Sequence, residues 1–152
     1  MVFQNDGWIE QRNKERVSAT LKVTYRLLSA DEKTEALNNP RYSETTAKQL
    51  PQLSKKFHVY HAVTKDISEG GLAITGTHDF IIGDWAEISF QPPQYNVPVI
   101  VLAEVKWRRE LTQSGSTFYM AGVSILAVDR DSMDRLSCFL LEEKVRKEKE
   151  TN

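Results

Sequence analysis

The chain has little of what several classes of protein require. Its 152 residues include one cysteine, Cys138, so no disulfide can form within the chain. No run of consecutive apolar residues is long enough to cross a bilayer, and no apolar run follows a basic start at the N-terminus. These absences predict a soluble, cytoplasmic protein without membrane insertion, in which Cys138 is a small buried hydrophobic residue.

An excess of charge of either sign is also missing. The 20 lysines and arginines nearly balance the 21 aspartates and glutamates, which gives a net charge of −1 and a pI near 6.3. Proteins that bind DNA or RNA through many phosphates usually carry a broad excess of positive charge, and a small barrel that binds single strands interleaves it with aromatic residues. We therefore expect no DNA or RNA partner, and any recognition of phosphate should be local.

Recognisable catalytic motifs are absent too. Neither the cysteine nor any serine lies in a histidine-bearing nucleophile motif, and no Gly-rich phosphate-binding loop is present. His58 and His61 form an H-x-x-H pattern, but residues three apart on a strand point to opposite faces, which does not favour a metal site. We predict that the protein is not an enzyme and holds no metal or cofactor.

Alternating apolar and polar residues predict a mainly β protein. Residues 17–27 alternate almost without fault, with Val23 and Tyr25 on the apolar face and Arg26 on the polar, wet face. Further strands are predicted at 57–64, 72–75, 85–90, 99–108 and 117–128. About six strands with one wet face each favour a small antiparallel barrel, because closure removes the exposed edges of an open sheet.

A polar insertion follows the first predicted strand. It covers residues 29–56, includes a capping box at Ser29 and Glu32, and contains short predicted helices near 30–37 and 44–50. Neither helix carries a broad apolar face. The role of the insertion stays open between a surface excursion and an arm that binds a partner.

The last part of the chain changes from a strand period to a helical one. Asp129 or Asp131 can cap a helix there. Its predicted apolar stripe, which should pack on the barrel, consists of Met133, Leu136, Leu140, Leu141 and Val145. We therefore divide the chain into a flexible N-terminal segment, 1–16, a barrel, 17–128, and a C-terminal helix with a charged tail, 129–152.

Two short motifs border the predicted strands. Arg12 and Arg16 stand four apart just before the first strand, and the sequence Asp66-Ile67-Ser68-Glu69-Gly70-Gly71 closes the second. Guanidinium groups bind guanine edges or phosphate oxygens, and a tight turn with a carboxylate, a hydroxyl and glycine allows close approach of a ligand. Together the motifs indicate a nucleotide receptor.

Each motif also has a purely structural interpretation. Arg12 and Arg16 can be solvated charges ahead of a strand. Asp66 and Ser68 can bond the amides of their own turn, with Gly70 or Gly71 at a positive φ angle.

Both motifs, in this order on a six-stranded barrel, resemble the PilZ family of bacterial receptors for cyclic di-GMP. The resemblance runs from about residue 10 to about residue 141 and implies a PilZ-like β-barrel closed by a C-terminal helix. It implies that Arg12 and Arg16 grip guanine Hoogsteen edges and phosphates of the dinucleotide. It further implies that Asp66 and Ser68 contact a guanine edge while Gly71 allows close approach. Adenine offers the wrong donors and acceptors to such a site, so cyclic di-AMP should bind poorly.

Three further residues are candidates for the same site. Gly70 belongs to the turn, and Trp107 lies where members of this family often carry an aromatic residue. The alternation around Trp107 places it with the apolar residues of its strand, which favours packing in the core over base stacking. Gln11 stands where many relatives have another arginine, which favours one bound ligand per chain but leaves two open.

The resulting functional hypothesis is a cyclic di-GMP effector. Ligand binding would draw residues 1–16 onto the barrel around residues 66–71, and the change would be passed to an unidentified protein partner. The alternative is a PilZ-fold interaction module that binds no nucleotide. The sequence leaves a monomer and a dimer equally open.

Overall fold

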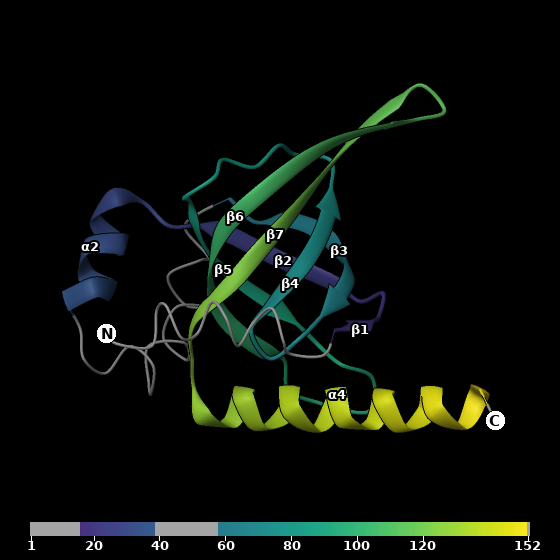
Figure 1. Cartoon of the computed structure of the whole chain (residues 1–152). Coiled ribbons are helices and arrows are strands. Elements are labelled where there is room, and N and C mark those ends of the chain that lie inside the picture. The colour runs from purple at the N-terminus through teal and green to yellow at the C-terminus, as the bar shows by residue number, and fades with distance from the viewer. Residues whose placement is uncertain (1–15, 39–57, 152) are drawn as a thin grey trace.

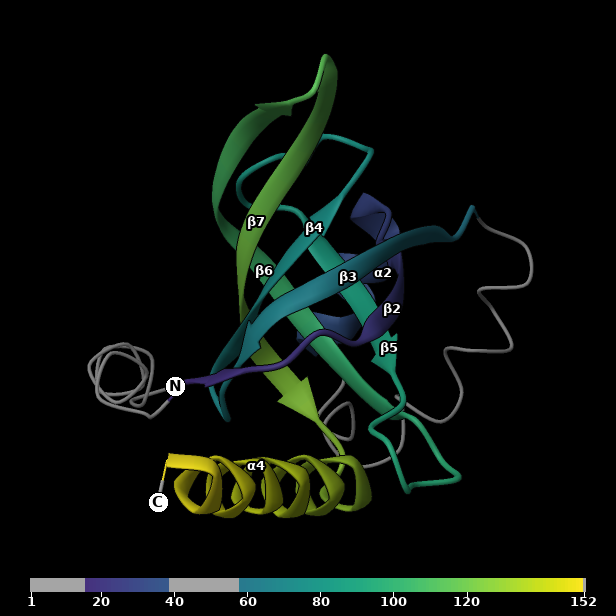
Figure 2. The ribbon, with the colours of Figure 1, turned by 90° about the vertical axis from the view of Figure 1, so that its right-hand side faces the viewer.

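The computed structural model describes residues 16–38 and 58–151 and shows a β-barrel with a long helix outside one end (Figure 1). A view turned by 90° places the helix on the same side of the barrel (Figure 2). The elements in chain order are β1 (Val17–Ser18), β2 (Lys22–Leu27), α2 (Ala30–Asn38), β3 (Tyr60–Ile67), β4 (Gly71–Gly76), β5 (Trp85–Phe90), β6 (Val99–Gln113), β7 (Ser116–Val128) and α4 (Arg130–Thr151).

Antiparallel pairing closes the barrel. β2 pairs with β3 on one side and with β5 on the other, and the ring continues through β4, β7 and β6. The short β1 extends the same edge along β3. Fully buried aliphatic side chains such as Ile67, Ile88 and Val101 fill the interior. The predicted mainly β, six-stranded antiparallel barrel with a C-terminal helix is therefore confirmed.

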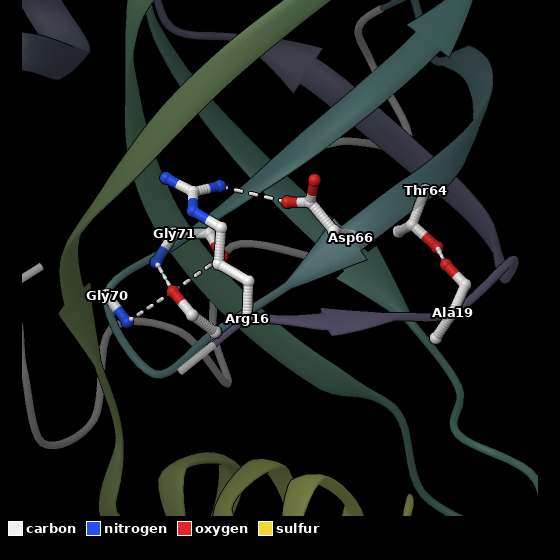
Figure 3. Close-up of polar contacts among 7 residues, drawn as sticks. Arg16, Ala19, Thr64, Asp66, Gly70 and Gly71 are labelled. Carbon is white, nitrogen blue, oxygen red and sulfur yellow. Dashed lines mark hydrogen bonds and ion pairs between the residues drawn. The ribbon is translucent and has the colours of Figure 1, made fainter. Parts of the chain in front are cut away.

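A bulge splits the predicted first strand into β1 and β2. Ser18 lies opposite Asp66 and Lys22 lies opposite Val63, so the first strand takes four steps where β3 takes three. The buried hydroxyl of Thr64 fills the break by donating to the carbonyl of Ala19 (2.5 Å; Figure 3). The same hydroxyl accepts the N–H of Leu21 at 2.8 Å. A side chain thus satisfies backbone groups that the interrupted ladder leaves without strand partners.

The capping box of the insertion forms as predicted. Ser29 N–H donates to the Glu32 carboxylate at 3.0 Å, and Glu32 N–H donates to the Ser29 hydroxyl at 3.2 Å. The helix that follows, α2, matches the prediction near 30–37. The second predicted helix, 44–50, lies outside the described residues.

Arg26 does not lie on a wet face, which corrects the sequence prediction. Its side chain is 1% exposed, and its Nη1 lies 2.7 Å from Glu32 Oε2 of α2. Glu87, on the neighbouring β5, is also buried, with one carboxylate oxygen 4.0 Å from Arg26 Nε. Burial raises the pKa of Glu87 to about 7, because the cost of burying its charge is larger than the lowering of the pKa by Arg26.

Helix α4 packs on the barrel through a stripe that differs from the predicted one. Asp129 caps the helix, with its carboxylate accepting the N–H of Ser132 at 2.7 Å. Leu136, Phe139 and Leu140 are buried, whereas Leu141 is 63% exposed. Leu141 lies about 140° around the helix axis from Leu136, too far to share its face. Cys138 is also exposed, so its predicted burial is wrong.

The hairpin of β6 and β7 extends past the barrel as an arm (Figure 1). β6 continues to Gln113, beyond the predicted end at residue 108, and the chain reverses at Ser114 and Gly115. Their φ angles of 53° and 81° are both positive, as a two-residue hairpin turn that follows the strand twist requires. The β6–β7 ladder shifts register twice: at Leu102/Ala103 the extra residue is Leu126 of β7, and at Val105/Trp107 the extra residue is Lys106 of β6.

We expect Glu87 to make the stability of the barrel depend on pH. The carboxyl in the unfolded chain loses its proton near its ordinary pKa of 4.5, whereas the folded one keeps it until about pH 7. Because the folded-state pKa is raised, the contribution to stability is complete below about pH 4.5 and is lost as the pH rises to about 7. Relative to Glu87→Gln, the free energy of unfolding of the wild type should fall by about 3 kcal/mol across this window.

Urea denaturation at several pH values measures this difference. Ser89→Ala, which changes the residue two positions along β5 and retains Glu87, should keep the pH dependence of the wild type. Parallel curves for the wild type and Glu87→Gln would contradict the prediction.

Candidate functional site

The turn from Ser68 to Gly71 connects β3 to β4 and holds itself together. The Ser68 side chain is 2% exposed, and its Oγ accepts the N–H groups of Gly70 and Gly71, both at 3.2 Å. Ser68 N–H donates to the Gly71 carbonyl at 2.9 Å. Neither glycine has a positive φ; the glycines with positive φ in the described ranges are Gly83 and Gly115. The Ser68 hydroxyl therefore orders the turn's own amides.

Gly71 is required by the packing of β4 against β7. A Cβ atom placed there would lie 2.3 Å from the carbonyl oxygen of Val123, a backbone atom that cannot move aside cheaply. Gly70 contributes its carbonyl, which accepts the N–H of Ile125 at 2.9 Å. Both glycines of the turn are thus held against strand β7.

The pairing of β1 with β3 brings the two sequence motifs together. Ser18 lies opposite Asp66, so Arg16, the residue just before β1, lies close to the Asp66 carboxylate. Arg16 Nη1 is 2.9 Å from Asp66 Oδ1 (Figure 3). The Arg16 side chain is 52% exposed and that of Asp66 is 26% exposed. Both groups therefore remain reachable from solvent, and an exposed pair of this kind adds only about 0–1 kcal/mol. Arg12 and Gln11 lie outside the described residues.

Trp107 joins the site because a bulge changes the face on which it lies. Val105 pairs with the buried Val123, and Trp107 pairs with Gly122, so Lys106 is the extra residue of β6. One inserted residue exchanges the two faces of a strand, and Trp107 is 38% exposed on the outer surface. The predicted packing of Trp107 in the core is therefore wrong.

A small cleft collects residues from both motifs and from the β6–β7 hairpin. Its volume is about 80 Å³. The residues that line it are Arg16, Ser68, Gly70, Gly71, Leu72, Lys106, Trp107, Gly122, Val123 and Ser124. Lys106, Gly122 and Ser124 did not stand out in the sequence, because nothing local to them marks which residues β6 and β7 place beside the turn. A larger groove of about 770 Å³ elsewhere on the barrel includes none of the motif residues.

A metal site and a membrane span each set a requirement on the described residues. Residues 16–38 and 58–151 contain no group of three or more side chains suited to hold a metal ion. His58 instead packs edge-on against Tyr60, with ring centroids 4.4 Å apart. Within the same ranges, no helix is both long and apolar enough to span a membrane.

The chain belongs to the PilZ domain family, whose family model matches residues 10–142. No match was found among curated protein sequences. The fold also matches solved structures at low sequence identity. The PilZ domain of YcgR from Escherichia coli, solved with c-di-GMP, is 15% identical with a TM-score of 0.55, and the match covers 93% of this chain and 99% of that one.

Two longer proteins share the fold. The Bacillus subtilis inhibitor of motility MotI (DgrA) is 14% identical, with a TM-score of 0.58 and 90% of this chain covered. The K. pneumoniae MrkH–c-di-GMP complex is 13% identical, with a TM-score of 0.58 and 91% covered. This chain spans about half of each, 52% of the MotI chain and 55% of the MrkH chain.

We expect Ser68→Ala to destabilise the turn. The substitution removes the acceptor of two backbone N–H groups at a buried position, which should lower the free energy of unfolding by about 1–3 kcal/mol. Chemical denaturation measures the loss, and hydrogen exchange should show faster exchange of the Gly70 and Gly71 amides. Ser18→Ala, at an exposed side chain of β1, is the matched control and should change stability by less than about 0.5 kcal/mol. Unchanged stability and unchanged amide protection in Ser68→Ala would contradict this role.

Proposed function

We propose that this protein is a receptor for cyclic di-GMP and not an enzyme. The observation that carries the proposal is the contact between Arg16 and Asp66 beside the cleft, which unites two separate motifs at one surface. The family supports it, and two of the structural relatives named above were solved with c-di-GMP. The exposed parts of both side chains are the groups that a ligand would meet first.

The chemistry of the pair suits guanine. An arginine fork donates to guanine O6 and N7 together, whereas a carboxylate accepts from the N1–H and the exocyclic amine of a guanine base. Because Arg16 and Asp66 form only a partly exposed ion pair, a ligand can replace their mutual contact at small cost. Adenine would leave these groups without suitable partners, so we expect selectivity against cyclic di-AMP.

The cleft is too small to enclose the ligand. Small-molecule sites usually span about 300–1,000 Å³, well above the roughly 80 Å³ found here. We propose that the cleft receives one edge of the dinucleotide and that residues 1–16, with Arg12 and Gln11, cover the remainder. Binding would then change the conformation of this N-terminal segment. One ligand per chain and two ligands per chain are both compatible with this arrangement.

A route for passing the change to a protein partner leads through α4. Lys147 of α4 donates to the carbonyl of Ser18 in β1, two residues after Arg16. A shift of the segment that carries Arg16 would therefore act on the last turns of α4. We propose that the downstream partner reads this end of the molecule.

A second candidate function is an interaction module that binds no nucleotide. The observation that favours it is that Ser68 and Gly71 already have structural roles, in the turn and against β7. In that case Ser68 and Gly71 would serve only to fold the turn, without contacting a ligand.

Isothermal titration with cyclic di-GMP distinguishes the two functions. We expect the wild type to bind and Arg16→Ala and Asp66→Ala to bind at least about tenfold more weakly, because each removes a charge-assisted contact worth about 1.5–3 kcal/mol. Arg108→Ala and Asp79→Ala are matched controls, since this pair is also a surface ion pair, at 2.7 Å, but lies on the other face of β6 from Trp107. No heat and no thermal stabilisation of the folded wild type would establish the interaction module instead.

Limited proteolysis tests the conformational change. Cleavage within residues 1–16 should slow markedly in saturating cyclic di-GMP, because a segment held on the barrel is less available to a protease. Cleavage elsewhere in the chain serves as an internal reference, and cyclic di-AMP at the same concentration should have no effect. Equal cleavage with and without ligand would contradict the proposed movement while leaving ligand binding intact.

A further inference from the structure

Gly122 lies directly beneath the indole of Trp107. A Cβ atom at residue 122 would lie 2.0 Å from Trp107 Nε1, 2.2 Å from Cε2 and 2.7 Å from Cζ2. Distances below 3.0 Å are not found for real Cβ atoms, so any side chain at residue 122 would displace the ring. The indole therefore rests against the backbone of β7 in space that only glycine leaves free.

Trp107 lies beside the motif turn as well as against Gly122. Trp107 sits opposite Gly122 in the β6–β7 ladder, immediately after the bulge that places it on the outer face. The ring borders the same cleft as the Ser68–Gly71 turn, and Gly122 and its neighbour Val123 also line that cleft. Displacing the ring would lift the indole away from this surface and change the shape of the cleft.

The neighbours of the indole are suited to a nucleotide. Lys106 precedes it and lines the same cleft, and the guanidinium of Arg109 lies 5.8 Å from the indole ring centroid, near the outer limit for a cation–π contact. Indole rings stack on bases, and cations close by favour phosphate groups. A base edge held at Arg16 and Asp66 would thus have an aromatic surface at the side of the cleft.

We infer that Gly122 is a positioning residue for the binding site. By having no side chain, it holds the Trp107 indole against β7 as one wall of the cleft, and the indole stacks on a guanine base of the ligand. This inference rests on the proposed function, since the stacked ligand is the cyclic dinucleotide. The positional part, the contact between Gly122 and the indole, stands on the ligand-free structure alone.

Binding measurements on four proteins test the inference. Isothermal titration with cyclic di-GMP compares the wild type, Gly122→Ala, Trp107→Leu and the double variant. Gly122→Ala should weaken binding by about 5- to 100-fold, the range for loss of one base–aromatic stack. In the Trp107→Leu background, Gly122→Ala should change affinity by less than about twofold, because the ring that it displaces is already gone.

Gly76→Ala is the matched control. A Cβ atom at residue 76 of the adjacent strand β4 would lie 3.2 Å from the carbonyl oxygen of His61, and the neighbouring atoms could yield by a few tenths of an ångström. Its affinity should stay within about twofold of the wild type. If Gly122→Ala alone does not fold, recovery of folding in the double variant would support the contact, and the loss of binding in Trp107→Leu would then test the stacking.

A ligand-free measurement separates this inference from the proposed function. In NMR spectra of the wild type, the indole N–H of Trp107, assigned by its loss in Trp107→Phe, should show a nuclear Overhauser effect to the α protons of Gly122. Absence of this effect would overturn the positioning role, whatever the protein binds. A wild type that binds cyclic di-GMP while Gly122→Ala binds equally well would overturn the inference and leave the receptor intact. A wild type that binds no ligand would overturn the stacking together with the proposed function.

Discussion

The pairing of β1 with β3 is the constraint on which the candidate site depends. Two residues of β1 lie opposite Ile67 and Asp66, and this short ladder alone brings Arg16 to the Asp66 carboxylate. Its register is offset by one residue from that of β2, and the Thr64 hydroxyl bridges the offset. A slip of one residue would move Arg16 by about 3.3 Å and turn it to the other side of the strand. A buried threonine thus fixes the position of an exposed arginine.

The motif residues divide into those that build the site and those that stay accessible on it. The Ser68 hydroxyl bonds the amides of the turn, and Gly71 allows the turn to pack closely against β7. These contacts hold the loop in place. Arg16, Asp66 and Trp107 keep exposed surface beside that loop. The division follows from the limited hydrogen-bonding capacity of a buried hydroxyl, which leaves the charged and aromatic groups to meet a ligand. A rigid turn also reduces the entropy that a ligand has to overcome on binding.

The two helices attach to the barrel by different physical means. Helix α4 buries Leu136, Phe139 and Leu140 at one end of the barrel, so apolar contact holds it. In contrast, α2 is joined to β2 through the buried contact of Glu32 with Arg26, close to Glu87. Charges placed inside a protein are costly unless they are paired, which makes the Arg26–Glu32 contact sensitive to pH. The polar insertion therefore begins with a buried ion pair beside a smaller apolar contact, in which Ala36 packs with Trp85 near Leu102.

The sequence by itself determined the class of fold and the identity of the two motifs. Strict alternation marks strands, turn residues separate them, and a capping box marks a helix start, because each of these signals depends on neighbours in the chain. Only the tertiary structure decided the position of Arg26, which alternation assigned to solvent and which is buried in contact with Glu32 of α2. It also decided that Trp107 faces outward over Gly122, since the single extra residue of a bulge reverses every face that follows it. Bulges and coverage arise from partners distant in the chain, and no local pattern of side chains records them.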